Sequence, residues 1–488
     1  VSSHGAAWNG FPLKVGEMTL GDHLRELGGD AYLIGKTHMR VDAKGMARLG
    51  LTPDSIIGAR VAECGFDIFV RDDGLWGMGP DGAYDEQASA YNQYLRDKGY
   101  EGENPWHDFA NAGLDAEGNI ASGWLYGNSH LPANIAEEDS ETPWLTQQAI
   151  KFLEEKADKD KPWLCHVSYI KPHWPYIVPA PYHKLYGPES FLAPIRDTAE
   201  LDAPHPVYAA FAQNAIGKAF RNEEVREKVL GAYMGLIKQI DDQMGVLFDY
   251  LKSSGQMENT MIVATSDHGD YLGDHWLGEK DLFHSPSVKV PLIIYDPSAT
   301  ADAGRGSVCD ALVEAIDLAP TFTDFMAGAI ADEWLEGRSL IPLLSGSPPR
   351  DWRDYVISEY DYSMSPMAAK LGIAPKDARL FMVADDRWKL VHCEGGLPPM
   401  LFDLKEDPDE LNDLGRHPDY QEARKHGYAM LYDWALRCGQ RTTLSTNEIV
   451  SNRGKSRRKG IVLGLAKESD AEAEILEKYT GKPPARPI

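Results

Sequence analysis

Apolar strand-like runs alternate with amphipathic helical patterns along the chain, and this alternation constrains the fold more than any other feature. The run "AYLI" at 31–34 follows a helical stretch, and "PWLCHVSYI" at 162–170 follows the helical period of residues 145–157. A long amphipathic helix then begins near residue 222 and precedes the strand-like run "MIVATS" at 261–266. Strands that alternate with helices predict an α/β fold with a mostly parallel sheet covered on both faces.

Composition limits the partners of such a protein. The 488 residues are 43% hydrophobic and 25% charged, which is the profile of a globular protein with one large and one smaller domain. Because 49 basic and 75 acidic residues give a net charge of −26, we expect neither nucleic acid nor an anionic membrane as a partner. No run approaches the roughly 20 apolar residues of a membrane-spanning helix. An anionic substrate must therefore be attracted by a local concentration of positive charge.

The cysteines indicate neither a disulfide framework nor a zinc site, because they are odd in number and contain no C-x-x-C pair. They are Cys64, Cys165, Cys309, Cys393 and Cys438. This pattern favours a reducing compartment, and hence the cytoplasm. The chain starts at Val1 within a polar stretch, so we expect an upstream segment, and the periplasm stays open because a signal peptide would lie there.

Ligands of open parallel sheets bind beyond the carboxyl ends of the strands, so the residues after each apolar run are the candidates for a site. Three such strand ends carry cationic, imidazole or carboxylate groups, namely Lys36 with His38, then His173, then Asp267 with His268. Taken singly, each group is more often a solvated loop or turn. Three of them at the ends of strands in one sheet would meet in one crevice, and the combination predicts a site.

The segment "TSDHGDYLGDHWLGEKDLFH" at 265–284 contains candidate ligands for a metal and a candidate lysine for binding an anion. Asp267 and His268 offer the mixed oxygen and nitrogen ligands that suit Mn²⁺, Ca²⁺ or Zn²⁺, with further carboxylates needed from elsewhere. Lys280 can return to the crevice because glycines let the loop fold back. A metal, two lysines and two histidines around one point would stabilise an anion and its leaving oxygen, which predicts transfer of a phosphoryl or sulfuryl group.

Together with "GKTH" at 35–38 and "KPHWPY" at 171–176, this segment resembles the sulfatase and phosphonate monoester hydrolase branch of the alkaline phosphatase superfamily. The resemblance extends over about residues 1–435 through "GLIKQIDDQMG", "VPLIIYDP", "AIDLAPTF", "LEGRSLIPLL" and "LFDLKEDPDELNDL". It implies an alkaline-phosphatase-like α/β sandwich with a mostly parallel central sheet, followed by a smaller α+β subdomain with a short antiparallel sheet.

We accordingly expect a catalytic domain over residues 1–340 and a C-terminal subdomain over residues 341–440. Within the first, residues 59–145 are rich in Gly, Asp and Trp, which suits decorated loops over the crevice mouth. The tail over 441–488 contains the basic cluster "SNRGKSRRKG". A solvated or subunit-bridging arm in a homo-oligomer is favoured there over nucleic-acid binding, because the cluster has no interleaved aromatic residues.

The resemblance assigns roles to the candidate residues. It makes Asp267 and His268 ligands of one divalent metal, with Ca²⁺ or Mn²⁺ preferred and Zn²⁺ or Mg²⁺ as alternatives. Lys280 would contact the anionic oxygens and the leaving group of a small anionic ester. His173 would be the general acid that protonates the departing alkoxide or phenoxide.

Three further residues would complete the site by the same resemblance. Lys36 and His38 would help to bind the nucleophile and the sulfuryl oxygens, and Asn9 would contact the oxyanion. Four residues match the family pattern only as loop residues, and their expected role is structural: Asp274, His275, Glu279 and His284.

The chain lacks one family element. Members of this branch use a C-x-P-x-R or S-x-P-x-R sequence, whose Cys or Ser is oxidised to formylglycine, and two aspartate ligands in a first strand and loop. No such pentapeptide occurs in the 488 residues, and Cys64 lacks both the proline and the arginine. We therefore expect an amino-terminally truncated enzyme, with formylglycine outside the chain and no turnover by this chain alone.

The expected activity is hydrolysis of aryl or alkyl sulfate esters. Phosphonate monoester or phosphodiester hydrolysis is the alternative, and it is less favoured because phosphonate hydrolases of this branch tend to carry uncharged hydroxyl residues where Lys36 and His38 stand. An alternative of another class is a non-catalytic metal-binding relic that keeps the fold without the nucleophile.

Overall fold

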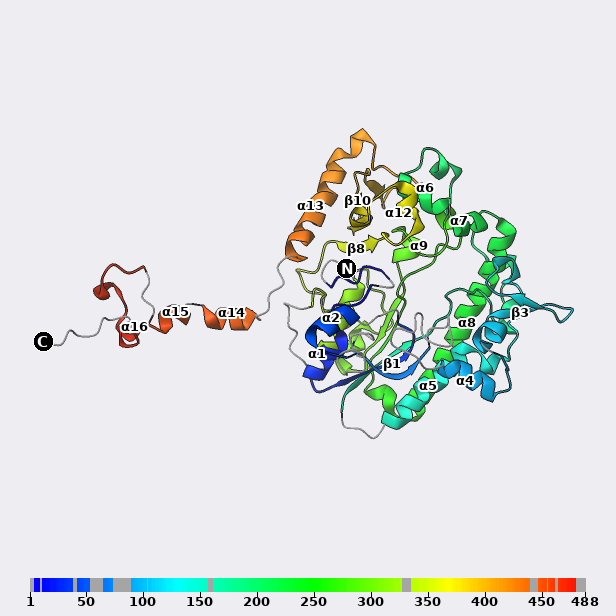
Figure 1. Cartoon of the computed structure of the whole chain (residues 1–488), viewed down its shortest axis with the longest axis horizontal. Coiled ribbons are helices and arrows are strands. Elements are labelled where there is room, and N and C mark those ends of the chain that lie inside the picture. Colours follow the sequence, from blue (N-terminus) through cyan, green and yellow to red (C-terminus); the bar gives the residue numbers. More distant parts are fainter. Residues whose placement is uncertain are drawn as a thin grey trace.

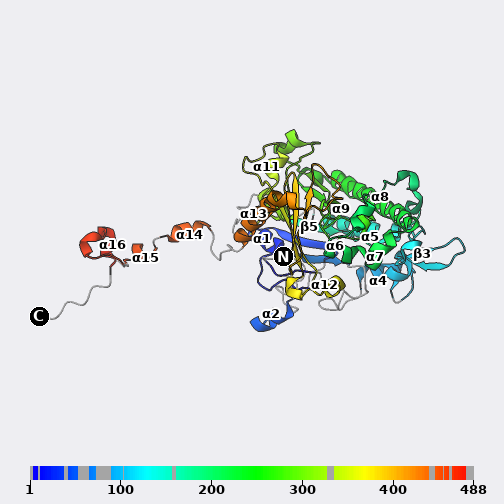
Figure 2. The ribbon, with the colours of Figure 1, turned by 90° about the horizontal axis from the view of Figure 1, so that it is seen from above.

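The computed structural model describes residues 4–8, 11–37, 42–52, 65–72, 89–102, 104–156, 161–326, 335–438, 446–453, 455–460 and 464–479. Figure 1 shows a main body of sheets and helices, from which a carboxyl-terminal arm extends to one side. The arm contains α14 (Thr446–Asn452), α15 (Lys455–Arg458) and α16 (Ala473–Glu477). The view from above shows the same separation of arm and body (Figure 2).

A three-stranded parallel sheet forms the centre of the body. Its strand order is β2 (Asp67–Arg71), β1 (Asp30–Gly35) and β5 (Trp163–Ser168), and both pairings are parallel. Leu33 and Ile34 of β1 are fully buried, as expected for a central strand with both faces covered. The strands predicted at 31–34 and 162–170 are thus confirmed.

Helices cover the two faces of this sheet. On one face, α5 (Glu141–Lys156) and α8 (Glu223–Ser253) join β1 in one apolar cluster, to which Ile34, Phe152 and Leu251 belong. On the other face, α1 (Leu20–Glu26) and α10 (Leu318–Phe325) pack against Leu33. The predicted long helix is confirmed as α8, whose amino end is capped by the Asn222 side chain through a 3.0 Å bond from the Glu224 backbone N–H.

Two more strands lie beyond the parallel sheet. β6 (Ile262–Thr265) and β7 (Leu292–Tyr295) pair with each other in antiparallel fashion. Within the described part of the chain, no strand pairs with the edge of β5 that faces away from β1, or with the edge of β6 that faces away from β7. His166, in the middle of β5, is accordingly exposed to solvent.

A four-stranded antiparallel sheet follows, with the order β11 (Met400–Asp403), β10 (Trp388–Cys393), β9 (Arg379–Ala384) and β8 (Val356–Asp361). One face packs against α13 (Gln421–Cys438). The other packs against α6 (Pro206–Ala212) and the loop that contains Tyr271 and Phe283. The C-terminal sheet therefore supports the loop that follows β6.

Further elements complete the described body. They are α2 (Ala43–Leu49), α4 (Ala90–Asp97), the short π-helix η1 (Trp106–Ala110), the hairpin of β3 (Ala112–Leu114) and β4 (Ile120–Ser122), α7 (Ala215–Phe220), α9 (Ser285–Val288), α11 (Ile341–Leu344) and α12 (Pro366–Leu371). None of the described helices combines the length and the apolar character that a bilayer span requires.

Candidate active site

The carboxyl ends of the three parallel strands meet at one edge of the central sheet. Gly35 at the end of β1 lies opposite Arg71 of β2 and opposite Ser168 of β5. Lys36, the next residue after Gly35, therefore lies beside the turn that follows β5 and contains His173. Only glycine fits at position 35, since its φ is +102° and a Cβ there would lie 2.2 Å from the Ser168 carbonyl oxygen.

His173 lies in a tight turn after β5 with its imidazole directed at Lys280. Its backbone N–H donates to the Ile170 carbonyl at 3.1 Å, and its Nδ1 lies 2.8 Å from the Trp174 carbonyl oxygen. Because a carbonyl only accepts, Nδ1 carries the proton and Nε2 presents its lone pair. The Lys280 Nζ lies 3.4 Å from that Nε2. Lys280 is thus the hydrogen-bond donor of this pair.

Electrostatics keeps this imidazole neutral in the free protein. Burial, together with the positive charges of Lys36 and Lys280, lowers the pKa of His173 to about 2. Both lysines therefore lie close enough to act on the same ring. A bound anion would offset their charge and raise the proton affinity of His173.

Asp267 and His268 follow β6 after Ser266 and place a carboxylate and an imidazole side by side. The His268 Nδ1–H donates to the Gly269 carbonyl at 2.8 Å, which leaves Nε2 with a free lone pair 3.3 Å from the Asp267 carboxylate. The Asp267 side chain is 80% exposed. Burial, with Lys280 acting in the same direction, lowers the pKa of His268, so the ring is in the neutral form that a metal ligand requires.

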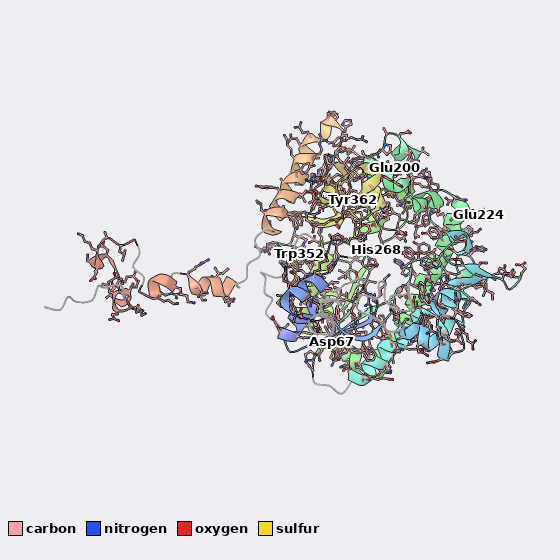
Figure 3. All side chains as sticks on the ribbon, viewed as in Figure 1. Asp67, Glu200, Glu224, His268, Trp352 and Tyr362 are labelled. Carbon is pink, nitrogen blue, oxygen red and sulfur yellow. The ribbon has the colours of Figure 1, made fainter. Side chains whose placement is uncertain are left out.

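These two side chains fit a divalent cation in donor type and direction. They do not fill a coordination sphere, and the described residues contain no group of three or more His, Cys, Asp or Glu arranged around a metal position. In the view of Figure 3, His268 lies near the middle of the body, and its side chain is 32% exposed. Lys36 and Lys280 each lower the pKa of both His268 and His173, so the two cationic side chains lie near both rings.

The loop from 269 to 287 returns Lys280 to this point. The Gly269 N–H donates to the Ser287 carbonyl at 2.7 Å, and the Ser287 hydroxyl donates to the Lys280 carbonyl at 2.7 Å. Gly273 adopts a left-handed φ of +100° within the loop. The structure places Lys280 against His173, with Lys36 and His268 near enough to interact with them electrostatically, whereas Asn9 and His38 lie outside the described residues.

Three of the four loop residues with an expected structural role form hydrogen bonds within the protein. Asp274 accepts a 2.8 Å bond from the Ile195 N–H, His275 Nδ1 lies 2.7 Å from Glu200, and His284 Nδ1 lies 2.9 Å from the Tyr271 hydroxyl. Glu279 differs from them. It is half-buried next to Lys280 with φ at +59°, and burial raises its pKa to about 7.

Sequence reasoning missed a set of buried polar groups beside the site. Asp72 directly follows β2 and is 2% exposed, so the rule that singled out Lys36 could also have found it. The other members are Asn111, Glu141 and Lys171, which are 1%, 3% and 7% exposed. No local pattern signals Asn111 or Glu141, because their partners are distant in the sequence.

Comparisons with solved structures identify the fold. A phosphonate monoester hydrolase from Silicibacter pomeroyi superposes with a TM-score of 0.74 at 25% identity, covering 90% of this chain and 83% of that one. The phosphonate monoester hydrolase of Agrobacterium radiobacter gives a TM-score of 0.74 at 27% identity, covering 89% and 83%. The fold is alkaline-phosphatase-like, and it places the protein in a class of hydrolases that act on ester bonds.

Sequence comparisons then give the family. The family model "Sulfatase" matches residues 9–329, and "N-sulphoglucosamine sulphohydrolase, C-terminal" matches residues 273–434. The chain belongs to the sulfatase family. It is 30% identical over 462 residues to the multifunctional alkaline phosphatase superfamily protein PehA of Trinickia caryophylli, covering 90% of this chain and 83% of that protein. It is 29% identical over 348 residues to an arylsulfatase of Clostridium perfringens, covering 69% of this chain and 64% of the arylsulfatase's length.

Proposed function

We propose that the complete protein hydrolyses sulfate monoesters of aryl or alkyl alcohols, using one divalent metal and a formylglycine nucleophile from a segment outside this chain. The observation that carries the proposal is the grouping of Lys36, Lys280 and His173 beside Asp267 and His268. Two cationic side chains at one point suit the oxygens of a small anionic ester. They also provide the local positive charge that a protein of net charge −26 needs to attract such a substrate.

The residues of the chain would divide the reaction as follows. Lys36 and Lys280 hold the sulfuryl oxygens and stabilise the charge that develops on them. Asp267 and His268 would hold a divalent cation, Ca²⁺ or Mn²⁺ before Zn²⁺ or Mg²⁺. When bound, such an ion polarises a sulfuryl oxygen as a Lewis acid.

Protonation of the leaving group falls to the Lys280 and His173 pair. The ammonium of Lys280 donates toward the lone pair of His173 Nε2, with 3.4 Å between the two nitrogens. As the nucleophile forms its bond to sulfur and the bond between sulfur and the alcohol oxygen breaks, the alcohol oxygen takes a proton from this pair and leaves as a neutral alcohol. His173 directs the proton because its Nδ1–H is fixed on the Trp174 carbonyl.

The two strand edges without partners support a further segment of chain at this site. His166 of β5 is accessible to solvent although protein atoms surround it. Those surroundings lower its pKa, while Asp267 at the end of β6 acts in the opposite direction. The end of β6 therefore lies near the middle of β5. A strand added at the open edge of β5 would end near His173 and Asp267, where a nucleophile is needed.

Phosphonate monoester hydrolysis is the second candidate, because the two structures that match with a TM-score of 0.74 are phosphonate monoester hydrolases. Both esters carry one negative charge, so charge alone does not separate them. The sulfate ester is favoured because Lys36 stands where phosphonate hydrolases of this branch tend to carry an uncharged hydroxyl residue. To test which activity is the main one, the kcat/KM of the complete protein is measured on a nitrophenyl sulfate and on a nitrophenyl phenylphosphonate. A higher kcat/KM on the phosphonate would make phosphonate hydrolysis the first candidate. No hydrolysis of either ester would favour a non-catalytic metal-binding protein.

Three broader features belong to the same proposal. We retain a catalytic domain over 1–340, a subdomain over 341–440 and a tail over 441–488, with the C-terminal sheet lying within the second range. The arm of α14 to α16 that extends from the body suits a contact between subunits of a homo-oligomer (Figure 1). The cysteine pattern favours the cytoplasm. The mass in solution, with and without residues after 438, tests the role of the arm.

A further inference from the structure

A buried lysine closes the turn that contains His173. The ammonium of Lys171 donates to the Pro175 carbonyl at 2.7 Å and to the Asn111 side-chain oxygen at 2.7 Å. Lys171 is 7% exposed, so these bonds are made away from solvent. His173 and Trp174 lie between the two ends of this bridge. The bridge therefore fixes the stretch of chain whose Trp174 carbonyl sets the tautomer and direction of the imidazole.

Asn111 ties this turn to a separate part of the molecule. Its side-chain N–H donates to the Trp106 carbonyl at 3.1 Å, and its own carbonyl accepts from the Gly123 N–H at 3.1 Å. Trp106 is itself held by a 2.7 Å bond from its indole N–H to Glu141. Asn111 thus joins η1, the β3–β4 hairpin and the His173 turn, and it is 1% exposed.

Charge balance explains why a lysine is held at this position. Burial lowers the pKa of Lys171 to about 8, Lys36 acts in the same direction, and the carboxylate of Glu141 opposes both. Burial raises the pKa of Glu141, and the charge of Lys171 with the side chains of Trp106 and Asp72 acts in the opposite direction. The ammonium of Lys171 is therefore used for contacts within the protein interior, and it does not bind the ester.

We propose that Asn111 and Lys171 are positioning residues that hold His173 in the geometry of proton donation, an inference that rests on the proposed function. They touch neither substrate nor metal. They act through the turn from Lys171 to Pro175, which aims Nε2 of His173 at Lys280. Without Asn111, the turn loses its bond to a residue outside the turn. Without Lys171, it also loses the bond across the turn to the Pro175 carbonyl. In both cases the imidazole is no longer held in one tautomer.

Leaving-group dependence gives the kinetic test in the complete protein. Misplacement of a catalytic group by about 1 Å can cost on the order of 100-fold in rate. For Asn111→Ala and for Lys171→Met we expect kcat/KM on an alkyl sulfate to fall by about 10- to 100-fold, and on nitrophenyl sulfate by less than about 3-fold, because only the poor leaving group needs the proton. Asn111→Asp keeps an acceptor for Lys171 but loses the N–H that donates to the Trp106 carbonyl, so it should restore only part of the alkyl sulfate activity.

Asn92→Ala is the matched control. Asn92 is a buried asparagine that holds the same η1 segment, through a 2.7 Å bond from the Trp106 N–H to its side-chain oxygen, but it does not contact Lys171. We expect it to lower the melting temperature without a selective loss on the alkyl sulfate. A loss of the same selectivity in Asn92→Ala would overturn the proposal, because any loosening of η1 would then suffice.

Imidazole NMR gives a test that does not need turnover. In protein labelled with ¹⁵N-histidine, with the His173 signals assigned through His173→Gln, the two-bond ¹H–¹⁵N pattern should show one Nδ1–H tautomer. In Lys171→Met and Asn111→Ala this pattern should give way to a mixture of tautomers. If one variant does not fold, the other decides. Retention of the parent pattern would overturn the positioning role, whereas inactivity of the parent on both esters would overturn only the proposed function.

Discussion

Lys280 donates toward His173, and not the reverse, because the imidazole carries its proton on Nδ1 and presents Nε2 to the lysine 3.4 Å away. A histidine with a pKa lowered to about 2 cannot serve as an acid on its own in the free protein. The family resemblance assigns the acid role to His173 and makes Lys280 a contact to the anionic oxygens and the leaving group. The geometry supports a shared role, in which the lysine supplies the charge and the proton while the histidine places it.

His173→Ala should therefore slow esters with poor leaving groups selectively. In the complete protein we expect kcat/KM on an alkyl sulfate to fall by about 100- to 1,000-fold, and on nitrophenyl sulfate by only a few fold. Steady-state kinetics on both substrates measures the difference. Equal losses on the two esters would remove His173 from proton transfer.

Asp267→Asn should weaken metal binding. The substitution removes the negative charge of one of the two ligands described, so we expect the affinity for Ca²⁺ or Mn²⁺ to fall by more than about 10-fold. Calorimetric titration and metal analysis of the purified complete protein measure it. Asp274→Asn is the control. Asp274 lies in the same loop as the proposed ligands, but it accepts a bond from the Ile195 N–H of another segment. Metal content unchanged in Asp267→Asn would contradict the ligand assignment.

Those parts of the site that follow from strand order could be predicted from the sequence. Lys36 and His173 come after β1 and β5, and parallel pairing brings the ends of these two strands to one edge. Asp267 follows β6, which pairs with β7 in a separate antiparallel sheet, so its position does not follow from the strand order of the central sheet. The sequence pattern does not single out the run "FDIFVR" at 66–71 as a strand, because it lies in a stretch of weak periodicity. Its pairing with β1, from Tyr32 opposite Asp67 to Gly35 opposite Arg71, makes it the third strand of the sheet.

The groups behind the site could not be predicted in this way. Asn111 and Lys171 are bonded across 60 positions in the sequence, and Trp106 and Glu141 across 35. Hydrophobic periodicity describes which face of an element is buried, but it does not identify the partner of a buried polar side chain. Only the packed structure pairs an asparagine from one segment with a lysine from another.

Glu279→Gln should flatten the pH dependence of stability. The pKa of Glu279 is raised from 4.5 to about 7 in the folded protein, chiefly by burial. The folded state therefore binds more protons than the unfolded state between pH 4.5 and 7, so the free energy of unfolding falls as pH rises through that window. Because the side chain is half-buried, we expect an effect of about 1–2 kcal/mol.

Chemical denaturation of parent and Glu279→Gln at several pH values from 4.5 to 8 checks this prediction. The variant should lose the decline that the parent shows between pH 4.5 and 7 and gain relative stability at pH 8. Glu258→Gln, at an exposed position, should follow the parent. A parent and a Glu279→Gln variant with parallel pH profiles would show that the carboxyl group is not perturbed by folding.

The buried ion pair of Lys389 and Glu410 should be required for stability, because it joins the C-terminal sheet to the loop of Lys280. The two side chains are 5% and 1% exposed and lie 2.6 Å apart. Glu410 also accepts a 2.6 Å bond from the Ser285 N–H, and Lys389 donates to the Phe283 carbonyl at 2.9 Å. Glu410→Gln leaves the ammonium buried without its counter-ion, so we expect the free energy of unfolding to fall by about 3–5 kcal/mol.

Asp386→Asn is the control, because it breaks an exposed pair with Lys405 at 2.6 Å. It should change the free energy of unfolding by less than about 1 kcal/mol. Similar small effects in both variants, measured by denaturant unfolding, would mean that the C-terminal sheet is held to the loop by apolar packing alone.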